Sequence, residues 1–194
     1  MARIPYPDVD RLPEHARVAL GKMAAPLNLM RMCAHAPMLV KPLLSLSTTL
    51  LTRLALSARH RELLILRVAR NTGCEYLHAQ HRTMALALGL DEDEVDAAWR
   101  GQVPHEAFDD VENALLEAAD ALHRAAAAPP ELVGFLDLRL GHERAVEVLV
   151  VVGHYRMLAG VLTSLAVDVD PQGEKFVALS GGRRPVAVGD EEAR

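Results

Sequence analysis

The sequence predicts an all-α protein. Its 194 residues include 30 Ala and 31 Leu, whereas aromatic residues make up only 4%. Ala and Leu are the strongest helix formers, while strands favour the β-branched and aromatic residues that are scarce in most of this chain. A chain of this length can bury one hydrophobic core, so we expect a single helical domain.

Proline, glycine and capping residues predict where the helices begin and end. The prolines at positions 5, 7 and 13 indicate an extended N-terminal arm. Ser57 is an N-cap candidate, Gly73 can end a helix, and Asp91 with Glu94 has capping-box spacing. Pro42 either kinks the third helix or marks its true start. We expect helices over residues 13–24, 28–36, 37–53, 57–70, 74–89, 91–100, 109–128, 131–140 and 142–167.

The last expected helix is the most apolar long segment of the chain. Its run of valines between 146 and 152 leaves a strand possible at its start, but the length of the whole segment favours a helix. Because it contains Glu147, His154 and Arg156, we expect it to be buried in the protein rather than in a membrane. We therefore expect a helical domain over 1–170 and a polar C-terminal tail over 171–194. That tail is either a flexible arm or docked on another subunit.

Charge and cysteine content narrow the classes of function. A net charge of -5 and a pI near 6.0 argue against nucleic acid or an acidic membrane as the main partner. Two cysteines cannot build a disulfide scaffold, and residues 1–10 lack the pattern of a secretory signal. We expect a cytoplasmic protein whose thiols are reduced at rest.

The segment from Glu62 to His81 carries the candidate chemistry. Cys74, His78 and His81 are spaced to share one face of a helix. Glu62 lies in the preceding apolar helix, which the Asn-Thr-Gly turn folds back, so Glu62 can face Cys74 or His81. A buried carboxylate needs a partner, because an unpaired buried charge costs several kcal/mol. The histidines are the obvious partners, although Arg67 or Arg82 could also pair with Glu62.

A helix N-terminus lowers the pKa of a thiol, so Cys74, a histidine and Glu62 together could form a proton-relay site. Each residue also has a simpler interpretation. Cys74 could be an inert core residue, and His78 and His81 could be surface or core histidines. Zinc could be bound by Glu62, Cys74, His78 and His81, but their spacing is no recognised zinc signature. We therefore expect no metal.

The spacing of Glu62, Cys74 and His81 resembles the core motif of the carboxymuconolactone decarboxylase/alkylhydroperoxidase D (AhpD-like) superfamily. The resemblance covers about Leu27 to Asp170. It implies an AhpD-like helical bundle that forms homo-oligomers, with a pocket for a small molecule near the motif helices. Its supporting segments are Ala34-His-Ala-Pro37, Ser57-Ala-Arg-His-Arg-Glu62, Arg70-Asn-Thr-Gly-Cys74-Glu-Tyr76-Leu-His78-Ala-Gln-His81 and Val152-Gly-His154-Tyr155.

One position departs from the hydroperoxidase branch of this superfamily. That branch has a second cysteine three residues after the first, and here that residue is Leu77. A sulfenic acid needs a second thiol to become a disulfide, and Cys33 is the only other cysteine. The sequence therefore argues against two-cysteine peroxidase activity.

The decarboxylase branch needs neither a cysteine pair nor a cofactor. The resemblance implies that His81 acts as acid or base and that Glu62 orients it or relays its proton. Cys74 stays a third catalytic candidate. The candidate binding residues are Tyr76, His78, His154 and Tyr155.

Three functions follow as hypotheses. The first is a cofactor-free acid/base enzyme acting on a small carboxylated lactone or a related acid. The second is a thiol peroxidase that uses Cys74 alone or with Cys33. The third is a non-catalytic helical oligomer in which the motif residues form a buried polar network. Under all three we expect a homo-oligomer (dimer, trimer or hexamer) with no nucleic-acid or membrane partner.

Overall fold

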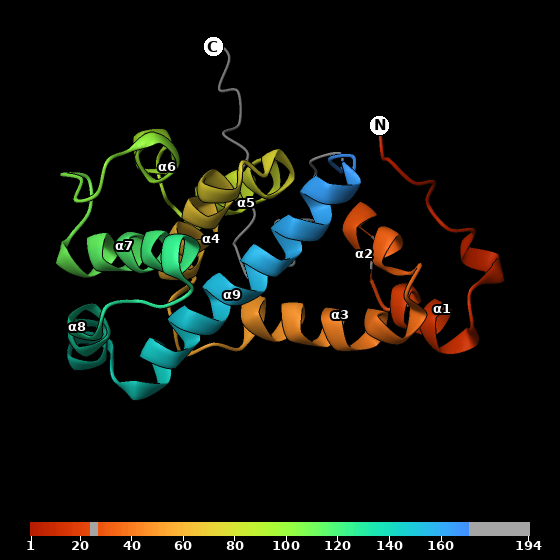
Figure 1. Ribbon diagram of the computed structural model, residues 1–194, viewed down its shortest axis with the longest axis horizontal. Coiled ribbons are helices and arrows are strands. Elements are labelled where there is room, and N and C mark those ends of the chain that lie inside the picture. The colour runs from red at the N-terminus through yellow and green to blue at the C-terminus, as the bar shows by residue number, and fades with distance from the viewer. Residues whose placement is uncertain (24–26, 171–194) are drawn as a thin grey trace, which may run out of the picture.

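The computed structural model describes residues 1–23 and 27–170. These residues form nine α-helices and one short 3-10 helix, and no strand occurs among them (Figure 1). The expected all-α fold is confirmed. The elements are η1 (Val9–Arg11), α1 (Glu14–Gly21), α2 (Asn28–Cys33), α3 (Pro37–Thr52), α4 (Ala58–Thr72), α5 (Glu75–Ala87), α6 (Glu92–Arg100), α7 (Asp110–Ala125), α8 (Pro130–Leu140) and α9 (His142–Leu165).

The observed helix ends follow the local signals in the sequence. Ser57 caps α4 by accepting a hydrogen bond from the His60 backbone N–H at 3.1 Å. Both α6 and α7 begin with a capping box. Pro42 lies inside α3, which begins at Pro37, so Pro42 does not mark its start. The valine-rich segment is helical within α9, and the expected tail over 171–194 lies outside the described residues.

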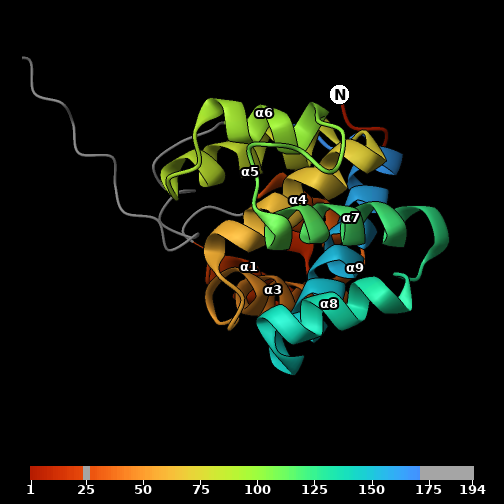
Figure 2. The same ribbon diagram turned by 90° about the vertical axis from the view of Figure 1, so that its left-hand side faces the viewer.

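Helix α4 is the central helix of the fold. It packs against α5, α6, α7 and α9, and the two views show α6 and α8 on opposite sides of it (Figures 1 and 2). Its residues 61–69 are all buried, which explains why this stretch is so apolar. Polar side chains within the stretch must therefore find partners inside the protein.

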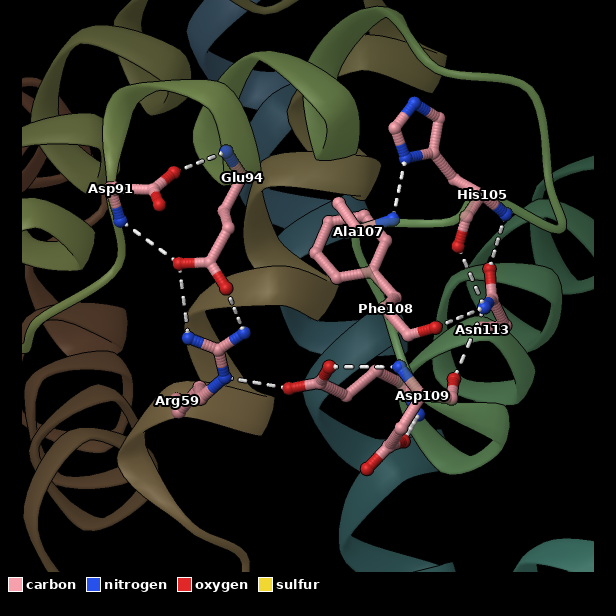
Figure 3. A network of polar contacts seen from close by, with 9 residues as sticks. Arg59, Asp91, Glu94, His105, Ala107, Phe108, Asp109 and Asn113 are labelled. Carbon is pink, nitrogen blue, oxygen red and sulfur yellow. Dashed lines mark hydrogen bonds and ion pairs between the residues drawn. The ribbon is translucent and has the colours of Figure 1, made fainter.

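Arg59, at the start of α4, joins this helix to α6 and α7 (Figure 3). Its Nη2 donates to Glu94 Oε1 at 2.5 Å and its Nε donates to Glu112 Oε1 at 2.6 Å. Each carboxylate also accepts from a backbone N–H at the start of its own helix. The hydrogen bond from Arg59 lowers the pKa of Glu94. One guanidinium thus fixes two helix starts against α4.

The N-terminal arm is docked along the end of α9. The Arg3 backbone N–H donates to Leu165 O at 2.8 Å, and the Tyr6 hydroxyl lies 3.1 Å from Asp168 Oδ2. Helix α9 is long and apolar enough to cross a membrane, but half of its most apolar window is buried inside the protein. It packs there against α4, α7 and α8, as a core helix does.

Candidate active site

The turn between α4 and α5 sets up the site. Gly73 ends α4 with φ +62°, a left-handed conformation that glycine adopts at little cost. Cys74 follows as the N-cap of α5, and its backbone N–H donates to Ala69 O at 2.9 Å. The chain therefore reverses tightly, so α5 runs back along α4 and its side chains reach the middle of that helix.

This reversal brings Glu62 and His81 together. His81 Nδ1 lies 2.7 Å from Glu62 Oε2, and the two residues are 0% and 5% exposed. An ionised carboxylate can only accept, so Nδ1 carries the hydrogen and donates it. The second ring nitrogen, Nε2, is then the one with a lone pair for proton transfer.

Arg61 holds the other oxygen of Glu62. Its Nε donates to Glu62 Oε1 at 3.0 Å, and its Nη2 forms an ion pair with the same oxygen at 2.9 Å. Its Nη1 donates to Leu51 O in α3 at 2.7 Å. Because Arg61 is only 4% exposed, the charges of Arg61 and Glu62 compensate each other inside the protein.

Sequence reasoning missed Arg61. It considered Arg67 and Arg82 as arginine partners of Glu62, but each has a different carboxylate. Arg67 Nη2 donates to Asp120 Oδ2 at 2.6 Å, and Arg82 pairs with Glu92 at the surface. The signal that could have found Arg61 is its position next to Glu62 at the start of a run of apolar residues.

Helix α9 adds two aromatic residues to the site. The Tyr155 ring meets the His81 ring edge-on at 5.0 Å, and burial, then the charge of Glu62, raises the pKa of Tyr155. The His154 ring contacts the Tyr155 ring at 5.4 Å. His154 Nε2 lies 3.0 Å from Ser47 Oγ of α3, and burial lowers the pKa of His154 to about 4. His154 is therefore uncharged near neutral pH.

The other two candidate binding residues lie apart from this pair. The Tyr76 hydroxyl donates to Asp170, and burial raises its pKa. The His78 ring stacks on Trp99 of α6 at 3.9 Å, and burial lowers its pKa. Helix geometry explains this, because residues three apart differ by about 60° around the axis. Since α5 lies against both α4 and α6, His81 faces α4 while His78 faces α6.

Cys74 also lies away from the carboxylate–histidine pair. It is 2% exposed and belongs to the main apolar cluster. It precedes His81 by seven residues, about 10 Å along a helix, and its thiol makes no hydrogen bond within the described part of the chain. Leu77 holds the position one turn before His81. Cys74 and Cys33 are both free thiols.

The residues considered for zinc do not gather into one site. Glu62 and His81 contact each other. His78 stacks on Trp99 of α6 instead, and Cys74 lies at the turn between α4 and α5. Over residues 1–23 and 27–170, no group of three or more His, Cys, Asp or Glu side chains is arranged to hold a metal ion. The chemistry of this arrangement is that of a buried carboxylate–histidine pair backed by an arginine.

Comparisons with known proteins agree with this arrangement. Residues 37–121, which include Glu62 and His81, match the carboxymuconolactone decarboxylase family. No protein of curated function matches the sequence.

Three solved structures share the fold. A peroxidase-related protein from Ralstonia eutropha JMP134, described as an alkylhydroperoxidase AhpD core, is 16% identical with a TM-score of 0.74 over 94% of this chain and 98% of its own. A peroxidase-related protein from Silicibacter sp. TM1040 is 17% identical with a TM-score of 0.72 over 91% and 94%. A debrominase is 16% identical with a TM-score of 0.65 over 93% and 94%. At these identities the likeness shows a common fold.

Proposed function

We propose that this chain, which belongs to the carboxymuconolactone decarboxylase/AhpD-like superfamily, is a cofactor-free enzyme whose Glu62–His81 pair performs acid–base chemistry on a small carboxylated lactone or a related acid. The observation that carries the proposal is the 2.7 Å contact between His81 Nδ1 and Glu62 Oε2 in the protein interior. Peroxidase-related proteins and a debrominase share this fold. The fold alone therefore does not identify the reaction, which must be inferred from the residues of the site.

The pair suits proton transfer to or from carbon. When a carboxylated lactone loses CO2, the C–C bond breaks and its electron pair enters the lactone as an enolate. The carbon must then take a proton, which protonated His81 delivers from Nε2 before the ring regains a proton from solvent. Glu62 keeps the ring oriented and stabilises its positive charge while it is protonated, as a buried carboxylate does for histidine in catalytic triads.

The surroundings of the pair support this role. Arg61 fixes one carboxylate oxygen and His81 takes the other, so neither catalytic group can rotate freely. Tyr155 covers the edge of the imidazole. Polar groups held in place in a water-poor site stabilise developing charge without having to reorganise.

The test is turnover of carboxymuconolactone and related lactone acids, followed by CO2 release and by loss of the lactone. We expect E62Q and H81N to lower kcat by about 100- to 10,000-fold, the usual contribution of general acid–base catalysis. R82Q is the matched control, because Arg82 follows His81 in α5 but is exposed and paired with Glu92. Absence of turnover across the lactones, or full activity in E62Q, would count against the proposal.

A thiol peroxidase is the second candidate, and the position of Cys74 at the N-cap of α5 favours it. The burial of Cys74 and the presence of Leu77 beside His81 weigh against it. The distinguishing assay is consumption of an organic hydroperoxide in the presence of dithiothreitol. A thiol peroxidase loses this activity in C74S, whereas an acid–base enzyme has none to lose.

A further inference from the structure

Helix α9 has an apolar strip on its outer side. Val146, Val150 and Met157 are 60%, 42% and 46% exposed, and Gly153 and Gly160 between and after them are exposed as well. The helix lies along the front of the molecule in Figure 1, and its other side packs against α4, α7 and α8. Large apolar side chains that gather on one exposed face are typical of a protein–protein contact.

The strip has the spacing of a coiled-coil seam. Its residues are Val146, Val150, Gly153, Met157, Gly160 and Ser164. Their alternating intervals of four and three form the heptad pattern, which keeps a row of side chains on one side of a helix where a second helix can pack against it. The buried residues of α9 lie on its other side. The row is therefore free to contact a partner.

The described part of the subunit does not require glycine at positions 153 and 160. Apart from the backbone of α9 itself, no atom of residues 1–23 and 27–170 lies within 4 Å of the point where a Cβ would stand at either position. Both glycines lie inside the helix, where glycine is less favourable than alanine. Glycine does allow another backbone to approach closely. The two glycines therefore indicate a contact with a helix outside the subunit.

The order of large and small residues fits a second copy of the same strip. Two copies of α9 can pack antiparallel about a two-fold axis at the level of Tyr155. The pairs that then face each other are Met157 with Gly153, Val150 with Gly160, and Val146 with Ser164 of the partner subunit. Each large side chain therefore meets a small one, as close packing between two helices requires. A parallel pair would instead place Met157 against Met157 and glycine against glycine.

The charges of α9 also favour a second copy. Over residues 148–167 the only charged side chain is Arg156, whose Nη1 donates to Leu122 O of α7 at 2.7 Å. Although the chain carries a net charge of -5, two copies can meet on this face without repulsion between carboxylates. An antiparallel pair also brings the positive end of each helix dipole beside the negative end of the other.

The size of the strip indicates a reversible contact. Residues 146–164 cover about 27 Å of helix. Two strips of this length bury less than about 1,200 Å², which is the range of weak, reversible complexes. A two-fold contact joins copies in pairs, so it fits a dimer or a hexamer built from dimers, and a closed trimer contains no such contact.

We propose that the strip of α9 binds the same strip of a second copy of this chain in an antiparallel, two-fold symmetric pair. The proposal names the surface through which the expected homo-oligomer forms. It does not depend on the proposed function, because the strip lies on the outer side of α9, whereas Tyr155, which contacts His81, lies on the inner side.

The experiment is oxidative cross-linking of the full chain, followed on non-reducing gels. V146C/S164C places one thiol at each end of the strip, in a C33S background because Cys33 is the partly exposed native thiol. The two positions are about 27 Å apart along one helix, too far for a disulfide within the subunit. In the proposed pair each faces the other position of the partner subunit.

The double variant should therefore form covalent dimers, whereas V146C alone and S164C alone should not. Covalent dimers of either single variant indicate a parallel pair and overturn the proposal. Absence of covalent dimers in the double variant overturns it as well.

Sedimentation velocity from about 1 to about 200 μM tests the same surface without new thiols. We expect the wild type to shift from monomers to even-numbered assemblies as its concentration rises. M157E places a carboxylate against the partner subunit and should raise the dissociation constant at least about 10-fold. M38E is the matched control, because Met38 of α3 is 74% exposed and lies outside the strip. A wild type that stays monomeric or forms only trimers, or equal effects of M157E and M38E, would overturn the proposal.

G160L separates packing between subunits from packing within one. Leucine at 160 meets no side chain of its own described subunit and is a better helix former than glycine, so the Tm of the monomer should not fall. Against Val150 of the partner subunit it should weaken association at least about 10-fold, because it overfills the contact. Undiminished association of G160L contradicts the close approach of the two helices.

Flotation with vesicles of phosphatidylcholine and phosphatidylglycerol tests the other occupant that an apolar helix face can have, a membrane surface. The wild type should remain unbound. Vesicle binding that M157E abolishes identifies lipid as the occupant and overturns the proposal.

Discussion

Removing the Arg61 guanidinium should destabilise the fold strongly, because the buried Glu62 carboxylate loses the positive charge beside it and keeps its contact with His81 alone. Glu62 is 0% exposed, and Arg61 supplies the contacts of 3.0 Å and 2.9 Å to its Oε1. Breaking a buried ion pair by deleting one partner costs about 3–5 kcal/mol. For a chain of this size, that corresponds to a fall in Tm of about 6–20 °C. R61M is the variant of choice, since methionine fills a similar volume without charge.

The double variant R61M/E62Q tests the reason for that loss. Glutamine in place of Glu62 removes the negative charge that Arg61 no longer compensates, so the double variant should be more stable than the sum of the single variants implies. We expect a coupling free energy of about 2 kcal/mol or more, as is found between residues in one buried network. Urea unfolding followed by far-UV circular dichroism, at one fixed protomer concentration, measures all four proteins. A loss below about 1 kcal/mol in R61M, or additive losses, would refute the reasoning.

Three further predictions concern stability. R59M should lose about 2 kcal/mol in urea unfolding, because Arg59 joins the partly exposed Glu94 to the buried Glu112. R82M, at an exposed pair, should change by at most about 0.5 kcal/mol, and equal losses in the two variants contradict this. His154 binds a proton more weakly in the folded protein, where its pKa is about 4, than in the unfolded chain, where it is about 6.5. Its contribution to the free energy of unfolding is therefore complete above about pH 6.5 and is lost as the pH falls towards about 4. H154N should flatten this part of the stability–pH curve by about 2–3 kcal/mol, and an unchanged curve contradicts the assignment. Ala126 and Gly73 both have a left-handed backbone, with φ of +58° and +62°, which glycine adopts at less cost than alanine. A126G should therefore raise the free energy of unfolding by roughly 0.5 kcal/mol, and G73A should lower it by about 1 kcal/mol. The reverse order contradicts the backbone argument.

The helix boundaries could be predicted because their causes are local. Ser57, Gly73 and Asp91 act within one turn of their own position, so the sequence around each is enough to place a helix end. The 3.6-residue period of α5 and the need of a buried carboxylate for a partner also made the meeting of Glu62 and His81 predictable.

The rest of the site depends on which neighbouring helix lies on each side, which spacing does not reveal. His78 and His81 are three residues apart, yet one contacts Trp99 of α6 and the other Glu62 of α4. Arg61 and Arg67 lie in the same helix and both could have reached a carboxylate. The placement of α7 gives Arg67 its own partner, Asp120, and leaves Glu62 to Arg61.

The most direct test of the central claim compares kcat of H81N with kcat of C74S on the same lactone acid. The account assigns the chemistry to the carboxylate–histidine pair, and His81 and Cys74 lie about 10 Å apart along α5. It predicts that H81N loses at least about 100-fold in kcat, while C74S stays within about twofold of the wild type once both are shown to be folded. Loss of activity in C74S with retention in H81N would contradict the account and would identify the Cys74 thiol as the reacting group.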